Sequence, residues 1–246
     1  MQDYHSYRFT TKEWMRYLLE WAVASMVLGY LFYQHLIGIL LLFPMGILYL
    51  RRKKQGLIKE RRWKLNLEFM DGIQALSAAL EAGYSAEHAL EEASRDLLHI
   101  YSDKSMIIME FNYMVNQVHM NIPIEKALEE FGRRSGVEDI RSFSEVFGTA
   151  KRTGGDMLQI IKISRDIICD KIEVKREILT MISAKRLEAN IMRLIPLFIL
   201  AYLMLSSPDF LKPMYHNLFG VLLMSIFLLL YFFAFLMIDR IVSIEV

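Results

Sequence analysis

The chain has 246 residues, of which 54% are hydrophobic, and its 29 basic side chains nearly balance 28 acidic ones, so the charge of the whole chain indicates no class of partner. A single cysteine, Cys169, excludes internal disulfides and thiolate metal clusters, and its helical surroundings predict an inert buried thiol. Apolar residues concentrate at the two ends, while charges gather in residues 51–190. This distribution predicts membrane segments on either side of a water-facing domain.

The N-terminal end begins with residues 1–16, which lack a secretory signal pattern and are expected to remain as a cytoplasmic segment. Residues 17–50 form an apolar run that is too long for one upright membrane helix of about 20 residues and slightly short for two. Gln34 and His35 interrupt its middle. We therefore expect a tight transmembrane hairpin with spans at 17–33 and 36–50, and one longer span is the alternative.

A basic linker, residues 51–64, follows this run and holds eight basic residues against one acid, Glu60. By the positive-inside rule this side of the membrane is the cytoplasm, and the hairpin then places the N-terminus there too. Binding of nucleic acid or anionic lipid would also explain a basic run. Because topology alone accounts for it, we expect no nucleic-acid partner.

Residues 65–190 show helical spacing of apolar residues and no alternation typical of strands. Phe69, Ile73, Leu76 and Leu80 make one such stripe. Turn-forming residues break the pattern near residues 82–84, 101–103, 121–123, 135–136 and 153–155. Six helices joined by short connections predict an up-and-down bundle.

Two of these breaks are followed by a repeated pattern, Ser85 to Ala93 and Pro123 to Phe131, at an offset of 38 residues. Each is read as a helix start. Gly83 can take the positive φ that ends the preceding helix, Ser85 can cap the next helix, and Pro123 suits a first turn. Glu87 and Glu125 favour the positive end of each helix dipole.

Four glutamates in these repeats, Glu91, Glu92, Glu129 and Glu130, have two interpretations. They can form a solvated helix face. Alternatively, because residues 66–132 hold twelve acids and three bases, they can form an acidic docking face for a basic partner.

No catalytic, cofactor-binding or metal-binding residue is predicted. The chain lacks the glycine-rich phosphate loop, the dinucleotide-binding turn and the zinc-binding histidine pair. Its six histidines never fall three or four residues apart. We therefore expect a non-enzymatic protein without cofactors.

The last part of the chain starts with a long amphipathic pattern from Asp156 to Ile195, uninterrupted by glycine or proline. A helix of some 40 residues would span about 60 Å and would link the bundle rigidly to the bilayer. Residues 191–240 then predict a second transmembrane hairpin, with a possible kink at Pro196 and a turn-rich outer loop at 207–213. Residues 241–246 form a tail.

Taken together, the sequence predicts an all-α membrane protein in which a six-helix cytoplasmic bundle is flanked by two transmembrane helical hairpins, about four spans in total. The bundle and both termini are expected in the cytoplasm.

Several motifs resemble the type II secretion F-domain family, over about residues 65–240. They are the two helix starts, the turn Arg152, Thr153, Gly154, Gly155, the S-A-K-R-L-E-A run at 183–189, Pro196, the P-D-F loop at 208–210 and Gly220. Within that family the chain most resembles the TadB and TadC branch of tight-adherence (Flp) pilus systems. Gly83, Pro196 and the Arg152–Gly155 turn match family positions and are expected to be structural. Asn121 stands where the family often has glycine, and it tolerates positive φ.

The resemblance implies a membrane platform of a pilus assembly machine, which couples a cytoplasmic secretion ATPase to prepilin subunits. The single F domain implies pairing with a second copy or a paralogue. A transporter subunit coupled to a nucleotide-binding protein is the alternative, and it would be expected to bury polar residues at mid-membrane. A membrane signalling enzyme would need catalytic residues that the sequence lacks.

Overall fold

The computed structural model describes residues 4–7, 9–35, 42–154, 156–215 and 217–242. These residues contain nine α-helices, one short 3-10 helix and no strand, which confirms the all-helical prediction. The helices are α1 (Thr11–Tyr33), η1 (Phe43–Met45), α3 (Gly46–Glu81), α4 (Ala86–Ile100), α5 (Met106–His119), α6 (Ile124–Ser135), α7 (Glu138–Thr153), α8 (Met157–Ser206), α9 (Pro208–Tyr215) and α10 (Leu218–Val242).

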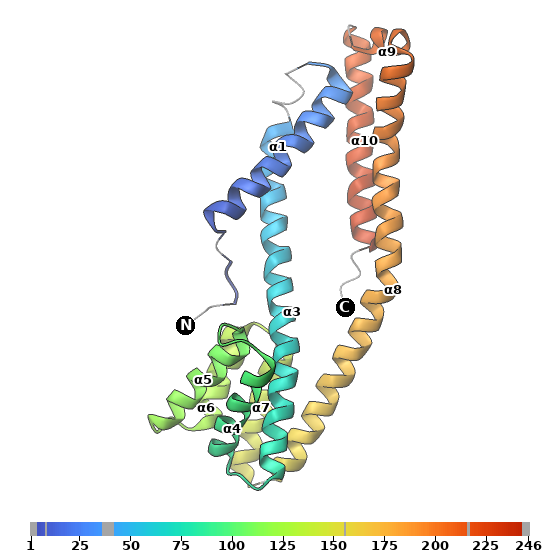
Figure 1. The fold of residues 1–246 in the computed structure, drawn as a ribbon. Helices are drawn as coiled ribbons and strands as arrows, with labels where there is room; N and C mark the ends of the chain where they lie inside the picture. The colour runs from blue at the N-terminus through green and yellow to red at the C-terminus, as the bar shows by residue number, and fades with distance from the viewer. Residues whose placement is uncertain (1–3, 8, 36–41, 155, 216, 243–246) are drawn as a thin grey trace. The chain divides into compact units, whose positions relative to one another are not determined.

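The chain divides into two compact units. The bundle unit comprises Met1–Arg8 and Lys54–Val174, and the apolar unit comprises Phe9–Lys53 and Lys175–Val246. In the bundle unit the short helices α4 to α7 gather around the C-terminal part of α3 and the N-terminal part of α8 (Figure 1). Its boundaries therefore differ from the expected domain at 65–190.

All five predicted breaks in the bundle fall between consecutive helices, from α3–α4 to α7–α8. The expected linker at 51–64 differs, because it lies inside α3, which runs unbroken from Gly46 to Glu81. Lysine and arginine are good helix formers, and the described chain offers no proline there to stop the helix. The basic residues are therefore helical.

The N-terminal apolar run has the predicted break, but neither α1 nor α3 is among the helices of the described residues that are long and apolar enough to cross a membrane. Helix α1 begins at Thr11, earlier than the expected span, and ends at Tyr33, where Gln34 takes a left-handed φ of 48°. The break at Gln34 is thus where the sequence placed it. Much of the expected second span, residues 36–41, lies outside the described residues.

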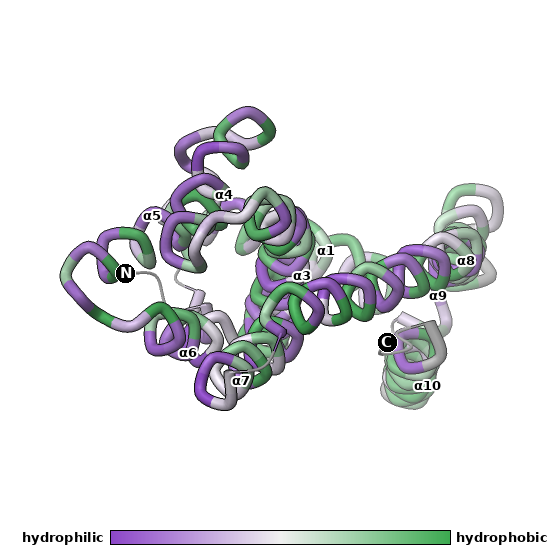
Figure 2. The backbone as a smooth tube through the Cα atoms, turned by 90° about the horizontal axis from the view of Figure 1, so that it is seen from below, coloured by the Kyte–Doolittle hydropathy of each residue, from purple (hydrophilic) through white to green (hydrophobic). Residues whose placement is uncertain are grey.

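Two helices in the described residues are long and apolar enough to cross a membrane, α8 and the Phe219–Arg240 part of α10. Helix α10 is hydrophobic along almost its whole length (Figure 2). By length and composition these helices indicate a possible membrane protein. The outer loop predicted at 207–213 is wrong, because residues 208–215 form the helix α9. Proline is well tolerated in a first helical turn, where Pro208 lies.

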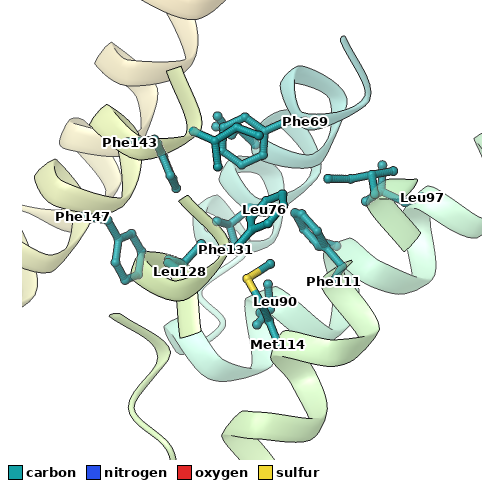
Figure 3. Packing of buried hydrophobic residues seen from close by; sticks show 14 of the residues in the cluster. Phe69, Leu76, Leu90, Leu97, Phe111, Met114, Leu128, Phe131, Phe143 and Phe147 are labelled. Atoms are coloured by element: carbon teal, nitrogen blue, oxygen red, sulfur yellow. The ribbon is translucent and has the colours of Figure 1, made fainter. Parts of the chain in front are cut away.

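The core of the bundle unit is aromatic and aliphatic, with side chains from α3 to α8. Phe69 of α3 meets Phe131 of α6 and Phe143 of α7 edge to face, at ring-centroid distances of 5.9 and 5.5 Å (Figure 3). Such pairs contribute about 0.5–1.5 kcal/mol beyond their buried area. Phe69, the first residue of the apolar stripe predicted on α3, therefore packs against both α6 and α7.

Helices α6 and α7 approach closely at Gly132. A Cβ atom built there would lie 2.7 Å from the Ser144 hydroxyl and 3.1 Å from the Arg141 Cα atom. Because one of these is a backbone atom, a side chain at this position would force the helices apart.

The substitution Gly132→Ala tests this crossing. We expect it to lower the free energy of unfolding by about 1–3 kcal/mol through overpacking. Gly148→Ala on α7 is the matched control, because a Cβ there meets only Glu125 at 3.7 Å. The control gains up to about 1 kcal/mol of helix propensity. Chemical unfolding of the detergent-solubilised chain, followed by circular dichroism, measures both, and equal stabilities would contradict the close crossing.

Candidate functional site

The repeated helix starts have the local geometry that the sequence predicts. Gly83 has a φ of 90°, and the Ser85 hydroxyl accepts a hydrogen bond from the His88 amide at 3.4 Å. Asn121 has a φ of 62°. Pro123 lies at the N-cap of α6, one position before the expected first turn. The two segments thus begin two helices by equivalent turns.

Lys151 of α7 joins the two repeats. Its ammonium group lies 2.8 Å from the Glu87 carboxylate of α4 and 3.2 Å from the Glu125 carboxylate of α6, which are equivalent positions of the repeat. The hydrogen bond from Lys151 holds the pKa of Glu87 below its ordinary value. Besides their favourable interaction with the helix dipoles, both glutamates therefore hold α4 and α6 to α7.

Three of the four glutamates of the expected acidic face are paired with other side chains of the bundle unit. Glu91 contacts His119 of α5 at 2.5 Å, and Glu92 pairs with Arg95 at 2.7 Å. Glu130 accepts a hydrogen bond from Gln117 at 2.6 Å and also pairs with Arg134. Only the Glu129 side chain has no polar partner in the part of the chain that is described.

A buried ion pair lies beside Glu130. Arg134 of α6 binds both carboxylate oxygens of Glu110 of α5, at 3.1 and 2.7 Å, and the Glu110 side chain is only 2% exposed. Tyr4 donates its hydroxyl to the same carboxylate at 3.0 Å. Burial, and then the charge of Glu110, raises the pKa of Tyr4.

The N-terminal strap, residues 4–7, is thereby attached to the bundle unit. Tyr4 is 1% exposed, and its carbonyl accepts a hydrogen bond from Arg62 at 3.2 Å. His5 lies between the Arg62 guanidinium, 2.8 Å from Nδ1, and the Arg133 carbonyl, 3.2 Å from Nε2. The expected cytoplasmic N-terminal segment thus contributes a core residue, Tyr4, which no local pattern in the sequence signals.

A charged groove opens between α6 and α7, with His5 of the strap at its edge. Its volume is about 910 Å³, and Gly132, Gly136, Val137 and Ser144 are small residues that line it. Its charged lining carries both signs: Lys126, Arg133, Arg141, Glu129, Glu130, Glu138 and Glu145. Two of the predicted docking glutamates, Glu129 and Glu130, therefore belong to this charged groove, while Glu91 and Glu92 do not line it.

At the turn after α7, the Arg152 and Thr153 side chains bond to backbone carbonyls of their own helix. Arg152 donates to the Gly148 carbonyl at 3.2 Å, and Thr153 donates to the Thr149 carbonyl at 3.0 Å. Gly154 has a φ of 67° and ends α7. Gly155 lies outside the described residues.

The apolar unit has its own polar contacts. Arg193 of α8 pairs with Asp239 of α10, and Arg52 of α3 lies 3.9 Å from the same carboxylate. Tyr231 of α10 donates to the Arg193 carbonyl at 3.0 Å. Pro196 lies beyond Arg193 in α8, and the helix continues through it to Ser206. These bonds hold α8 and α10 together as an antiparallel pair.

Helix α1 also packs within the apolar unit. Its Tyr33 hydroxyl is 2.9 Å from the Ser225 hydroxyl of α10, and Tyr215 of α9 donates to the Leu31 carbonyl at 2.8 Å. The two expected hairpins therefore share contacts, which the sequence did not indicate.

Comparison of the chain with protein-family models, with curated proteins and with solved structures finds no match. Among the described residues, no three His, Cys, Asp or Glu side chains converge in a way that could hold a metal ion. Cys169 is half-buried, and burial raises the pKa of its thiol. The site therefore consists of paired charges that join helices and of one charged groove.

Arg134→Met tests the buried ion pair. Without Arg134, the Glu110 carboxylate would be buried and uncompensated, so we expect a loss of about 3–5 kcal/mol in the free energy of unfolding. Arg133→Met is the matched control, since Arg133 is exposed and its loss should change stability by less than about 0.5 kcal/mol. Equal effects of the two substitutions would contradict this role of the pair.

Lys151→Met tests the bridge between the repeats. We expect a loss of about 1 kcal/mol at neutral pH, as for partly exposed ion pairs. Because the folded pKa of Glu87 is lowered, its contribution is present above the ordinary pKa of 4.5 and is lost as the pH falls through the folded value. The difference between wild type and variant should therefore shrink in acid. A difference that stays constant between pH 7 and pH 3 would contradict the bridge.

Proposed function

We propose that this protein is a non-enzymatic membrane platform of a type II secretion or type IV-like (Tad/Flp) pilus assembly machine. It couples a cytoplasmic secretion ATPase to the extraction of prepilin subunits from the membrane and to filament assembly. The observation that carries the proposal is helix α8. It begins just after the Arg152–Gly155 turn of the bundle unit and continues unbroken for 50 residues into an apolar candidate span.

The proposed topology has two transmembrane hairpins in the plasma (inner) membrane. The bundle unit and both termini are cytoplasmic. Two candidate spans support the C-terminal hairpin, and the break after α1 at Gln34 supports the N-terminal one. The basic residues at the start of α3 support the orientation. The platform works as an oligomer of this chain or with a paralogous F-domain protein.

The mechanism follows from the continuity of α8. An α-helix of 50 residues is about 75 Å long. We infer that α8 carries a push at its bundle end to its apolar end. Arg193 and Tyr231 bind α8 to α10, so α10 moves with it. ATP-driven motion of the partner thereby reaches the segment that contacts prepilin in the bilayer.

An insertion after Lys175 tests this transmission. A seven-residue Gly/Ser segment there should abolish surface filaments while the chain still binds the ATPase, because a flexible segment does not transmit force. A seven-residue alanine-rich helical segment is the matched control. It lengthens α8 by about 10 Å but turns its end by only about 20°. We expect the control to retain filaments at a reduced level.

Electron microscopy of the cells counts the filaments, and co-purification with the ATPase measures binding. Normal filaments with the flexible insertion would contradict transmission through α8. Normal filaments after deletion of the whole protein would contradict the platform function. In that case, loss of uptake or export of a small solute would favour the transporter alternative.

A further inference from the structure

The groove between α6 and α7 brings several unpaired charges of both signs together beside one hollow. Glu87, Glu91, Glu92 and Glu125 are all paired within the unit. In the groove, Arg141 and Glu145 pair with each other at 3.0 Å, and Glu130 pairs with Arg134. Four exposed side chains in the groove make no salt bridge or side-chain hydrogen bond among the described residues: Lys126, Glu129, Arg133 and Glu138. Of these, Glu138 has a longer-range electrostatic interaction with Lys171.

These four side chains carry both signs around one hollow. We propose that the groove is the docking site for a segment of the cytoplasmic ATPase that presents an acidic group to Lys126 and Arg133 and a basic group to Glu129 and Glu138. The proposal rests on the proposed function for the identity of the partner.

The charges favour a protein segment over other occupants. A nucleotide or a phospholipid headgroup carries only negative charge at its phosphates, and Glu129 and Glu138 would repel it. In a two-fold symmetric contact a second copy of this chain would bring the same concave surface, and two hollows of about 910 Å³ do not fill each other. A convex helix or loop with charges of both signs would fill the hollow and would pair with its acidic and its basic side chains.

The groove also suits a partner that binds and releases in each cycle of ATP hydrolysis. Its unpaired charges are exposed, and exposed charges change association rates and salt dependence more than they raise affinity. His5 forms part of the lining and lies six residues before the start of α1 in the chain. A docked segment would therefore touch the strap that leads into α1.

The test is a charge swap in the full-length chain, reconstituted in nanodiscs. The variant combines Lys126→Glu, Arg133→Glu, Glu129→Lys and Glu138→Lys, so that net charge is unchanged. The purified secretion ATPase of the same organism is the probe, and surface plasmon resonance measures its binding. We expect the swap to weaken binding about tenfold or more, and wild-type binding to weaken as salt rises from about 50 to 500 mM.

A control variant with Asp96→Lys and Lys104→Glu also keeps the net charge, at exposed side chains outside the groove that make no salt bridge or side-chain hydrogen bond within the described residues. It should bind the ATPase within twofold of wild type. Circular dichroism of all three proteins establishes that the swap variant is folded. A photocrosslinking amino acid in place of Arg133 should link the chain to the ATPase, and one in place of Asp96 should not.

The outcomes separate the two proposals. If wild type binds the ATPase and the folded swap variant binds it equally well, the groove is not the docking site, although the platform function stands. If wild type does not bind the ATPase, the platform function and the docking site both fail. Binding of wild type to anionic vesicles through the groove, or a change of self-association in the swap variant alone, would overturn the choice of occupant.

Discussion

The bundle unit depends on one buried interaction, the ion pair between Arg134 and Glu110. Removing two charges from water is costly, and the pair is tolerated because both oxygens of Glu110 are bonded and Tyr4 adds a further donor. The pair joins α5, α6 and the N-terminal strap at a single point. The buried charge of Glu110 is stable only when Arg134 and Tyr4 are in place. Few other arrangements of α5 and α6 would keep both partners there.

Other polar contacts act at helix ends in the same unit. The Glu68 carboxylate of α3 is buried and accepts a hydrogen bond from the Ile107 amide at 3.0 Å, at the start of α5, where Ser105 makes no side-chain cap. Lys151 binds the first turns of α4 and α6. Because unpaired amides at helix starts need acceptors, the Glu68 contact satisfies a local requirement of α5 and also packs α5 against α3. The Lys151 contacts neutralise the two glutamates and hold α4 and α6 to α7.

These internal pairs also decide which charges remain for a partner. The net negative charge of residues 66–132 suggests an acidic docking face, but most of its glutamates are used in holding helices together. The charges that remain unpaired beside one hollow have both signs. Because most glutamates of the expected acidic face are paired within the unit, we infer that the groove between α6 and α7 is the better candidate for a docking surface.

The sequence by itself determined the helices of the bundle, their breaks and the left-handed turns at Gly83, Asn121 and Gly154, because these depend on apolar spacing and on the φ preferences of neighbouring residues. It did not predict the helix at 208–215, because Ser207 before it and Pro208 and Pro213 within it are typical of a loop. Only the tertiary structure decided that Tyr4 is a core residue and that Lys151 pairs with a glutamate 64 positions away. Such contacts join residues that no local period connects, so only the packing of the helices brings them together.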